Sequence, residues 1–416
     1  MALDQNLACC PKICYTEAMS DIDELLTRGV ANIIPGKDEL KKALESGRKL
    51  NVYIGIDPTA TKIHLGHTVP LRTLNRLATL GHNVTFLIGD FTALIGDSSD
   101  KESERPVLTS QQIEDNFKDY KEQAEKVLDF SKISIKYNSE WLKTLSFEEI
   151  VKLCQHFSGN DFVSRELVKK RLTDGKRIGL HEFLYPIMQG YDSYFMDTDI
   201  QIGGTDQTFN MQAGRTLQKD LRQKESFVLA TTLLTGSDGK KMSKTQGNVI
   251  WLDDEPNNMY AKVMAVDDDL IINYFTLATN LSMEKIGEYE KKLKNGENPI
   301  NIKKSLAHQI VTELHNSEAA DLAQQEFEKT VQNRELPDDL PVIDITGYLS
   351  GPGFASISDV LLKERIVESK SKVKLLIDQK GIRLDGKNID NRAIEFKLNT
   401  EHVLEVGRRA FKIVVK

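Results

Sequence analysis

Two clusters of candidate phosphate ligands stand far apart in the sequence. The first is IHLGHTVP, in which His64 and His67 flank Gly66 at a spacing of three residues. The second is GSDGKKMSKTQGN, residues 236–248, a glycine-punctuated loop that carries three lysines. Imidazole N–H groups and ammonium groups both bind phosphoryl oxygens, and glycine lets the backbone approach a phosphate closely. Together the clusters predict a nucleotide phosphate site. Taken alone, the first could consist of ordinary loop histidines, and the second could be a solvated surface turn.

A third pattern places polar side chains on a face that should be buried. In LHEFLYPIMQGYDS, residues 180–193, Tyr185, Gln189 and Asp192 stand at positions i, i+4 and i+7 of a predicted helix, among apolar neighbours. Buried polar groups need hydrogen-bond partners. These side chains therefore belong either to a ligand pocket or to a buried structural network.

The elements around the two histidines place them at the edge of a sheet. LNVYIGI (50–56) and NVTFLIG (83–89) are rich in strand-forming residues, and VPLRTLNRLATL (69–80) has a helical pattern. A strand–loop–helix–strand unit of this kind forms a right-handed crossover in a parallel sheet. Ligands of such sheets bind beyond the carboxyl ends of the strands, at helix N-termini. We therefore expect His64 and His67 where a phosphate would bind.

The composition limits the class of protein. A chain of 416 residues has room for two or three domains, and 40% hydrophobic with 28% charged residues is typical of a globular protein. No apolar run approaches the length of a membrane span. The four cysteines, Cys9, Cys10, Cys14 and Cys154, contain no C-x2-C pair. We therefore expect reduced thiols, no dedicated metal site and a cytoplasmic location.

The charge is unevenly distributed along the chain. Residues 351–416 hold 14 Lys and Arg against 9 Asp and Glu, whereas the remainder holds 41 against 53. A basic terminal module on an acidic body is expected when one part of a protein meets a polyanion, although a small surface-rich domain can also be basic. At the other end, residues 1–18 lack a charged start followed by an apolar core. We expect them to form a disordered extension.

The two phosphate clusters together resemble the paired signatures of class I aminoacyl-tRNA synthetases, HIGH and KMSKS, here HLGH and KMSKT. With YIGIDPTA, FTALIGD, IQIGGTDQTFN and the FLYP helix, the chain resembles the bacterial-type tyrosyl-tRNA synthetase family in order from Met19 onward. The resemblance implies a tyrosine–tRNA ligase. Such an enzyme activates L-tyrosine with ATP to tyrosyl-adenylate and pyrophosphate, then transfers tyrosine to the 3′ end of tRNA(Tyr). Magnesium is expected with the ATP, without a dedicated protein cage.

The resemblance also implies a role for individual residues. The phenol of tyrosine would meet Tyr53 and Asp192, its ammonium Asp97, Tyr185 and Gln189, and its carboxylate Gln207. The residues implied for ATP binding are Gly55, Asp57, His64, Gly66, His67, Gly204, Asp206, Lys241, Met242, Ser243 and Lys244. Those implied for catalysis around the pyrophosphate are Thr59, His64, His67, Lys101, Arg105, Lys241 and Lys244. GDSSDKESER, which contains Lys101 and Arg105, departs from the family in lacking its Pro and Gly.

The predicted fold class is α/β, with three parts in order. A Rossmann-like parallel-sheet catalytic domain with a helical insertion and the lysine loop covers 19–250, and a helical anticodon-side domain covers 251–335. A linker at 336–350 then leads to a small α+β RNA-binding domain at 351–416, which resembles a ribosomal small-subunit protein. Its expected tRNA-binding residues are Ser369, Lys370, Lys372, Lys374 and Arg383. The resemblance also implies a homodimer that forms through the insertion near 120–165.

Three rival functions share some of these features. A tryptophanyl-tRNA synthetase has the same fold and both signatures, but an indole pocket would not need Asp192 facing Tyr53. A small-molecule nucleotidylyltransferase would use H-x-G-H without a basic terminal module. An RNA-binding or splicing factor built on an inactive synthetase would not need a pocket of chemically competent residues. Tyrosine-dependent exchange between ATP and pyrophosphate discriminates among all of them.

Overall fold

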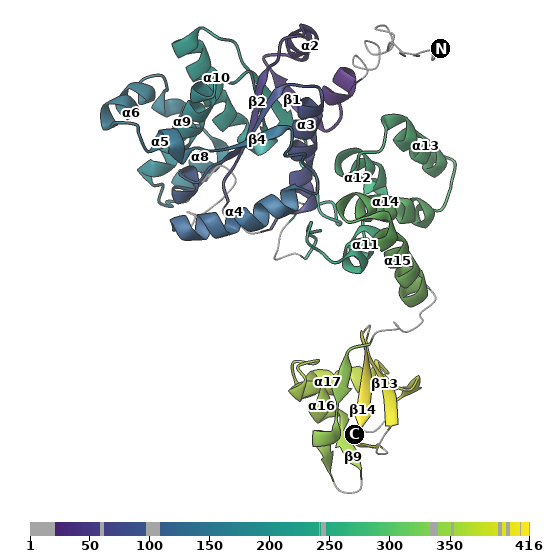
Figure 1. Ribbon diagram of the computed structural model, residues 1–416. Coiled ribbons are helices and arrows are strands. Elements are labelled where there is room, and N and C mark those ends of the chain that lie inside the picture. The colour runs from purple at the N-terminus through teal and green to yellow at the C-terminus, as the bar shows by residue number, and fades with distance from the viewer. Residues whose placement is uncertain are drawn as a thin grey trace, which may run out of the picture. The chain divides into compact units, whose positions relative to one another are not determined.

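The computed structural model describes residues 21–58, 62–96, 109–240, 242, 247–332, 340–350, 353–389, 393–396, 400–407 and 409–415. The predicted extension at 1–18 lies outside these residues. The chain divides into two compact units, Met1–Ala323 and Gln324–Lys416, which Figure 1 labels by element.

The first unit is built on a six-stranded sheet in the order β1-β6-β5-β2-β3-β4. Its strands are β1 (Val30–Ile34), β2 (Asn51–Ile56), β3 (Asn83–Ile88), β4 (Ile133–Tyr137), β5 (Ile200–Gly204) and β6 (Phe227–Thr231). All neighbours are parallel except β1, which runs antiparallel to β6. The predicted parallel sheet and its two predicted strands are therefore confirmed. Because the chain passes from β2 to β3 and β4 on one side and later fills β5 and β6 on the other, the strand order reverses between β2 and β5.

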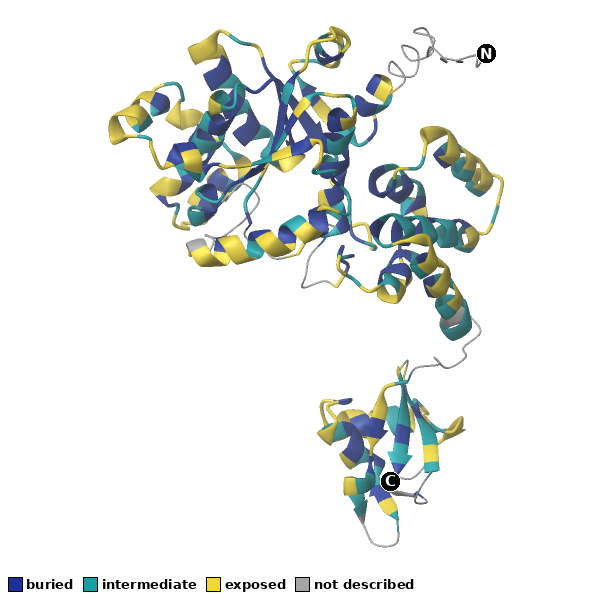
Figure 2. Ribbon diagram, viewed as in Figure 1, coloured by how far each residue is buried: buried dark blue, intermediate teal, exposed yellow. Residues whose placement is uncertain are grey.

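Helices surround this sheet (Figures 1 and 2). They are α2 (Lys37–Glu45), α3 (Thr68–Thr79), α4 (Ser110–Ala124), α5 (Ser139–Leu142), α6 (Phe147–Cys154), α7 (Gly159–Val163), α8 (Glu166–Thr173), α9 (Leu180–Phe195) and α10 (Thr208–Arg222). Helix α3 confirms the helix predicted after HLGH and buries Leu71, Leu74 and Leu77. Helix α9 is the predicted FLYP helix. It packs closely on α10, since a Cβ on Gly190 would lie 3.1 Å from the Ala213 carbonyl carbon.

Five further helices complete the first unit, as the sequence predicted for the stretch after residue 251. They are α11 (Pro256–Met264), α12 (Ile271–Ala278), α13 (Met283–Lys294), α14 (Pro299–Leu314) and α15 (Ser317–Phe327), the last of which runs into the second unit. Tyr260, Tyr274 and Phe275 are fully buried among them. Among the described residues, no helix combines the length and apolar character that crossing a membrane requires.

The second unit has its own sheet and its own core. A five-stranded sheet runs in the order β11-β10-β13-β14-β7, with β7 (Val342–Asp344), β10 (Ile382–Leu384), β11 (Lys387–Asn388), β13 (Thr400–Val406) and β14 (Arg409–Val415). A smaller sheet contains β8 (Leu349–Ser350), β9 (Phe354–Ser356) and β12 (Ala393–Glu395), and the helices are α16 (Ile357–Lys363) and α17 (Lys370–Asp378). The predicted two helices and short strands are confirmed.

One expectation for this region needs correction. We expected residues 336–350 to act as a linker because of their prolines and glycines, yet β7 pairs parallel with β14, Ile343 opposite Ile413. Ile343 and Ile345 are buried in the core of the second unit. Three of the four residues from Val342 to Ile345 are β-branched, which favours strand formation despite the flanking proline.

Candidate active site

The candidate site lies where the strand order reverses, at the carboxyl end of β2. Asp57 follows this strand directly, and its Oδ2 accepts a hydrogen bond of 2.8 Å from the Tyr185 hydroxyl of α9. Its Oδ1 accepts one of 2.7 Å from the Thr92 hydroxyl. A Cβ on Gly89 would lie 2.1 Å from this Oδ1 atom, so the carboxylate needs glycine beside it. The structure thus joins Asp57 and Tyr185, two of the predicted site residues, in one hydrogen-bonded group.

The HLGH motif forms a short 3-10 turn, Leu65–His67, that leads directly into α3. The His64 backbone N–H donates to His67 Nδ1 at 3.3 Å, and the two rings stack with centroids 3.7 Å apart. Desolvation by the surrounding protein lowers the pKa of His67, although part of the residue is open to solvent. Because Nδ1 accepts a hydrogen bond, the proton of the neutral ring resides on Nε2. His67 therefore presents a neutral N–H donor at the helix N-terminus.

The HLGH motif contacts the chain a few residues beyond the lysine loop, although the two segments are far apart in the sequence. The Leu65 N–H donates to the Ile250 carbonyl at 2.9 Å, and the Leu252 N–H donates to the Ile63 carbonyl at 2.9 Å. His64 thereby pairs with Trp251 in an isolated antiparallel bridge. This bridge ties the chain just after the lysine loop to the HLGH motif.

The lysine loop itself is described only in part. Within it, Met242 is buried, whereas Lys241, Ser243 and Lys244 lie outside the described residues. Asn248 Nδ2 donates to Asp238 Oδ1 at 2.7 Å across the base of the loop. The other predicted site residues outside the described part are Thr59, Asp97, Lys101 and Arg105.

The FLYP helix buries a carboxylate beside the sheet. Asp192 is 2% exposed, and its oxygens accept hydrogen bonds from Trp141 Nε1 at 2.7 Å and Asn138 Nδ2 at 3.1 Å. Burial raises the pKa of Asp192 to about 8, and these two donors act in the opposite direction. Two directed donors on a buried carboxyl show that its position is closely defined.

Tyr53 lies close to this carboxyl group. Burial, with the nearby charge of Asp192 as the second cause, raises the pKa of the Tyr53 phenol. The Tyr53 hydroxyl donates to Gln201 Oε1 at 3.1 Å, and Gln201 Nε2 donates to the Met211 carbonyl at 2.9 Å. The structure therefore brings Tyr53 and Asp192 together, as the sequence predicted, but also gives Tyr53 a protein partner.

Sequence reasoning missed five residues that hold this site. They are Gly89, Thr92, Asn138, Trp141 and Gln201. Asn138 links the two carboxyl groups of the site, because its Nδ2 donates to Asp192 and also, at 3.0 Å, to Thr92 Oγ1, which in turn donates to Asp57. Position alone was a usable signal for Gly89 and Asn138, each of which follows the carboxyl end of a parallel strand.

Three of the remaining predicted residues, Gly204, Asp206 and Gln207, lie at or just after the end of β5. A Cβ on Gly204 would lie 2.4 Å from Oδ1 of the exposed Asp206, so the Asp206 side chain would have to move if Gly204 were replaced. Gln207 Oε1 accepts a hydrogen bond from Asn210 Nδ2 at 3.0 Å. Gln189 is half-buried on α9, one turn from Tyr185, and Gly55 lies in β2.

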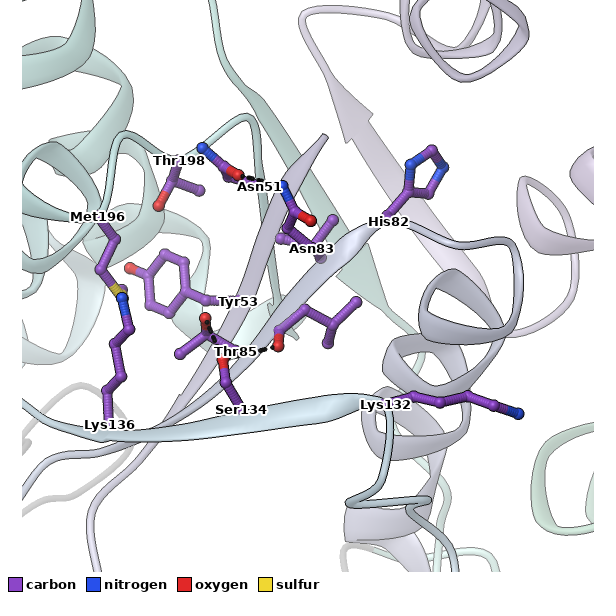
Figure 3. Close-up of a pocket in the computed structure, with 12 residues that line it drawn as sticks. Asn51, Tyr53, His82, Asn83, Thr85, Lys132, Ser134, Lys136, Met196 and Thr198 are labelled. Atoms are coloured by element: carbon purple, nitrogen blue, oxygen red, sulfur yellow. Dashed lines mark hydrogen bonds between the residues drawn. The ribbon is translucent and has the colours of Figure 1, made fainter. Parts of the chain in front are cut away.

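A pocket of about 440 Å³ opens on the same sheet but away from these motifs (Figure 3). Its polar lining comes mostly from the amino-terminal halves of β2, β3 and β4 and includes Asn51, Asn83, Thr85 and Ser134. Of the predicted site residues it includes Tyr53 only. We place the candidate active site at the carboxyl edge of the sheet, because HLGH, Asp57 and Asp192 lie there. The pocket lies on the other side of Tyr53, toward the amino-terminal ends of the strands.

The predicted RNA-binding residues of the second unit are exposed around α17. Ser369 caps this helix, its hydroxyl accepting from the Lys372 N–H at 3.3 Å. Lys370 and Lys374 are four residues apart and share one helix face, whereas Lys372 is rotated by roughly 200° from Lys370. Arg383 lies on β10 and pairs with Glu405 at 3.5 Å. The predicted basic surface is therefore divided over two faces of α17.

Comparisons with known proteins agree on one family. Residues 45–332 match the model of the family described as tRNA synthetases class I (W and Y). The tyrosine–tRNA ligase of Carboxydothermus hydrogenoformans is 40% identical over 94% of this chain and 97% of its own length. That of Thermotoga maritima is 39% identical over 93% and 96%. A C-terminally truncated mitochondrial tyrosyl-tRNA synthetase from Aspergillus nidulans has a similar fold, with a TM-score of 0.64 at 22% identity over 78% of this chain and 98% of that one.

Proposed function

The chain belongs to the class I tRNA synthetases for tryptophan and tyrosine. We propose which of its residues bind each part of the substrates of a tyrosine–tRNA ligase. The enzyme activates L-tyrosine with ATP and transfers it to tRNA(Tyr). We place the substrate phenol between Tyr53 and Asp192, and the phosphates of ATP at HLGH and the lysine loop. Because charged tRNA is used in translation, we propose a cytoplasmic location.

The buried carboxyl of Asp192 supports tyrosine as the amino acid. A phenol O–H can donate to a carboxyl oxygen of Asp192, which already accepts from Trp141 and Asn138. Phenylalanine would leave the buried carboxyl without its third hydrogen-bond partner, so it should be used much less efficiently than tyrosine. Tyrosyl-tRNA synthetase is a known example of this selectivity. The test is exchange of pyrophosphate into ATP with tyrosine, phenylalanine or tryptophan supplied. Equal exchange with tryptophan would contradict the assignment.

The ATP side of the site supplies donors for phosphate oxygens. The neutral His67 N–H and the start of α3 would bind phosphate oxygens, and the ammonium groups of Lys241 and Lys244 would follow the charge onto the departing pyrophosphate. The tyrosine carboxylate then attacks the α-phosphorus in line, and the bond to pyrophosphate breaks. We propose that Mg²⁺ enters bound to ATP. Among the described residues, no group of three or more His, Cys, Asp or Glu side chains could hold a metal.

Exposed apolar side chains within the helical insertion near 120–165 and on the two helices that follow it support a homodimer. Phe147 and Leu180 are 81% and 82% exposed, and Val151, Val163 and Leu172 are also exposed. They lie on α6 to α9, of which α6, α7 and α9 share one apolar cluster through Leu153, Phe162 and Ile187. Large exposed apolar side chains on helices that share a core are typical of an interface.

Leu180→Asp is expected to convert the dimer into a monomer, because it places a charge in an interface that depends on apolar burial. Sedimentation analysis of the wild type and the variant tests this. The matched control is Leu322→Asp on α15, where the leucine is 58% exposed. A dimer that survives Leu180→Asp would contradict the proposed interface, as would a monomeric wild type.

The second unit is proposed to bind tRNA. Ending the chain after Glu335 removes β7 together with its partner β14, so it is a cleaner cut than one near residue 351. Amino-acid activation should survive, because every proposed pocket residue precedes Thr245. Tyrosylation of tRNA should fall sharply, and its dependence on salt should weaken as phosphate contacts are lost. Equal loss of both activities in a folded truncated chain would show that this unit supports the active site instead.

A further inference from the structure

A buried arginine anchors the helix that begins at HLGH. Arg72 lies in the second turn of α3 and is 5% exposed. Its Nη1 lies 2.8 Å from Glu313 Oε2 on α14, and its Nη2 donates to the Ala278 carbonyl at the end of α12 at 2.8 Å. Glu313 is fixed in turn, because its Oε1 accepts from the Asn280 N–H at 2.7 Å and from Gln309 Nε2 at 2.7 Å.

A second buried arginine holds the same end of α12. Arg28 Nε donates to the Thr276 carbonyl at 2.7 Å, and Arg28 Nη2 donates to the Thr279 carbonyl at 2.7 Å. The last carbonyls of a helix have no partners within the helix and carry partial negative charge. Two guanidinium groups from the sheet-bearing part of the chain therefore cap α12 and define its position.

Helix α12 also contacts the base of the lysine loop. The Tyr274 hydroxyl donates to the Thr235 carbonyl at 2.8 Å, and Tyr274 is fully buried. Just before the helix, the Asp267 N–H donates to the Ser237 carbonyl at 2.9 Å. One helix thus holds α3 at its end and the start of the lysine loop near its middle.

We propose that Arg72 is a positioning residue for ATP activation, acting through α12 and α14 on the relative placement of HLGH and the lysine loop. The inference rests on the proposed phosphate roles of these two motifs. Arg72 itself touches no proposed ligand. Because in-line attack tolerates little displacement of the reacting groups, a small shift of α3 against the lysine loop should slow adenylate formation without disturbing the tyrosine pocket.

Four variants of the full-length enzyme test this proposal: Arg72→Met, Glu313→Gln, the double variant, and Arg72→Lys. Arg72→Met should lower kcat for pyrophosphate exchange by about tenfold or more, with KM for tyrosine within about twofold of wild type. It should also lower the melting temperature, because it leaves Glu313 buried without its cation. The double variant removes that unpaired charge and should recover most of the melting temperature while kcat stays low. Arg72→Lys, which keeps a cation, should restore part of kcat.

The control on the same helix is Thr79→Ala at the end of α3, where the residue is exposed and its hydroxyl donates to the Asn75 carbonyl of the same helix at 3.0 Å. It should leave kcat close to wild type. The proposal is overturned if kcat returns together with stability in the double variant, since Arg72 would then serve stability alone, or if Arg72→Met keeps the wild-type kcat. Failure of the wild-type enzyme to catalyse tyrosine-dependent exchange would instead overturn the proposed function.

Discussion

Replacing Asp192 by Ala is expected to abolish the use of tyrosine, whereas Tyr53→Phe should cost only about 1–2 kcal/mol of transition-state stabilisation. The first change removes the acceptor for the substrate phenol and takes from the Trp141 and Asn138 donors the acceptor that they share. The second removes one hydroxyl, which in the structure donates to Gln201. Pyrophosphate exchange at varied tyrosine concentration measures both effects. A larger loss from Tyr53→Phe would show that the carboxyl group does not bind the phenol.

The acidity of Asp192 supplies an independent check on the same site. The pKa of its carboxyl in the folded, ligand-free enzyme, about 8, lies above the ordinary value of 3.8. The resulting contribution to the free energy of unfolding is therefore fully present below about pH 4 and is lost as the pH rises through 8. Relative to Asp192→Asn, the ligand-free wild type should lose thermal stability between these pH values. Parallel pH profiles of the two melting temperatures would contradict the assignment.

Lys241→Ala or Lys244→Ala should slow adenylate formation by on the order of a hundredfold or more, with tyrosine affinity little changed. Both ammonium groups are proposed to act mainly as the phosphates separate, so their loss affects the transition state more than the bound ground state. Single-turnover adenylate formation and equilibrium tyrosine binding measure the two quantities separately.

Lys240→Ala is the matched control in the same loop. The Lys240 backbone carbonyl accepts the Gly236 N–H at 2.7 Å. The alanine variant keeps this bond, so we expect only a small effect on the rate of adenylate formation. A loss of tyrosine affinity as large as the loss of rate, in either of the other two variants, would show that the loop has been placed wrongly.

The elements of the first unit were predictable because their signals are local. The strand at Asn51–Ile56 and the helix at Thr68–Thr79 follow from residue type and periodicity within a few positions. The face shared by Tyr185 and Asp192 follows from helical geometry alone. The contact between HLGH and the segment at Ile250 could be anticipated only through the family resemblance, because nothing local links residues so distant in the chain.

The supporting groups of the site were beyond such reasoning. Trp141 reaches Asp192 across 51 positions and Gln201 reaches Tyr53 across 148, and no periodic pattern encodes such pairs. The same holds for Arg72, which stands in a helix pattern where an arginine usually indicates a solvated position. Its burial depends on Glu313 and Ala278 meeting it in space.

The capping of α12 bears on how this protein can be dissected. The stretch from 251 to 323 contains four complete helices, α11 to α14, and most of α15, with Tyr260, Tyr274 and Phe275 fully buried among them, which makes it look separable as a fragment. However, the guanidinium groups that satisfy the last carbonyls of α12 come from Arg28 and Arg72, some 200 or more positions earlier in the chain. A fragment that begins at residue 251 would expose those carbonyls and would leave Glu313 without its cation. These helices are contiguous in the sequence, but their folding depends on residues outside the stretch. A chimaera that replaces them with the helices of another protein must therefore keep compatible partners at positions 28 and 72.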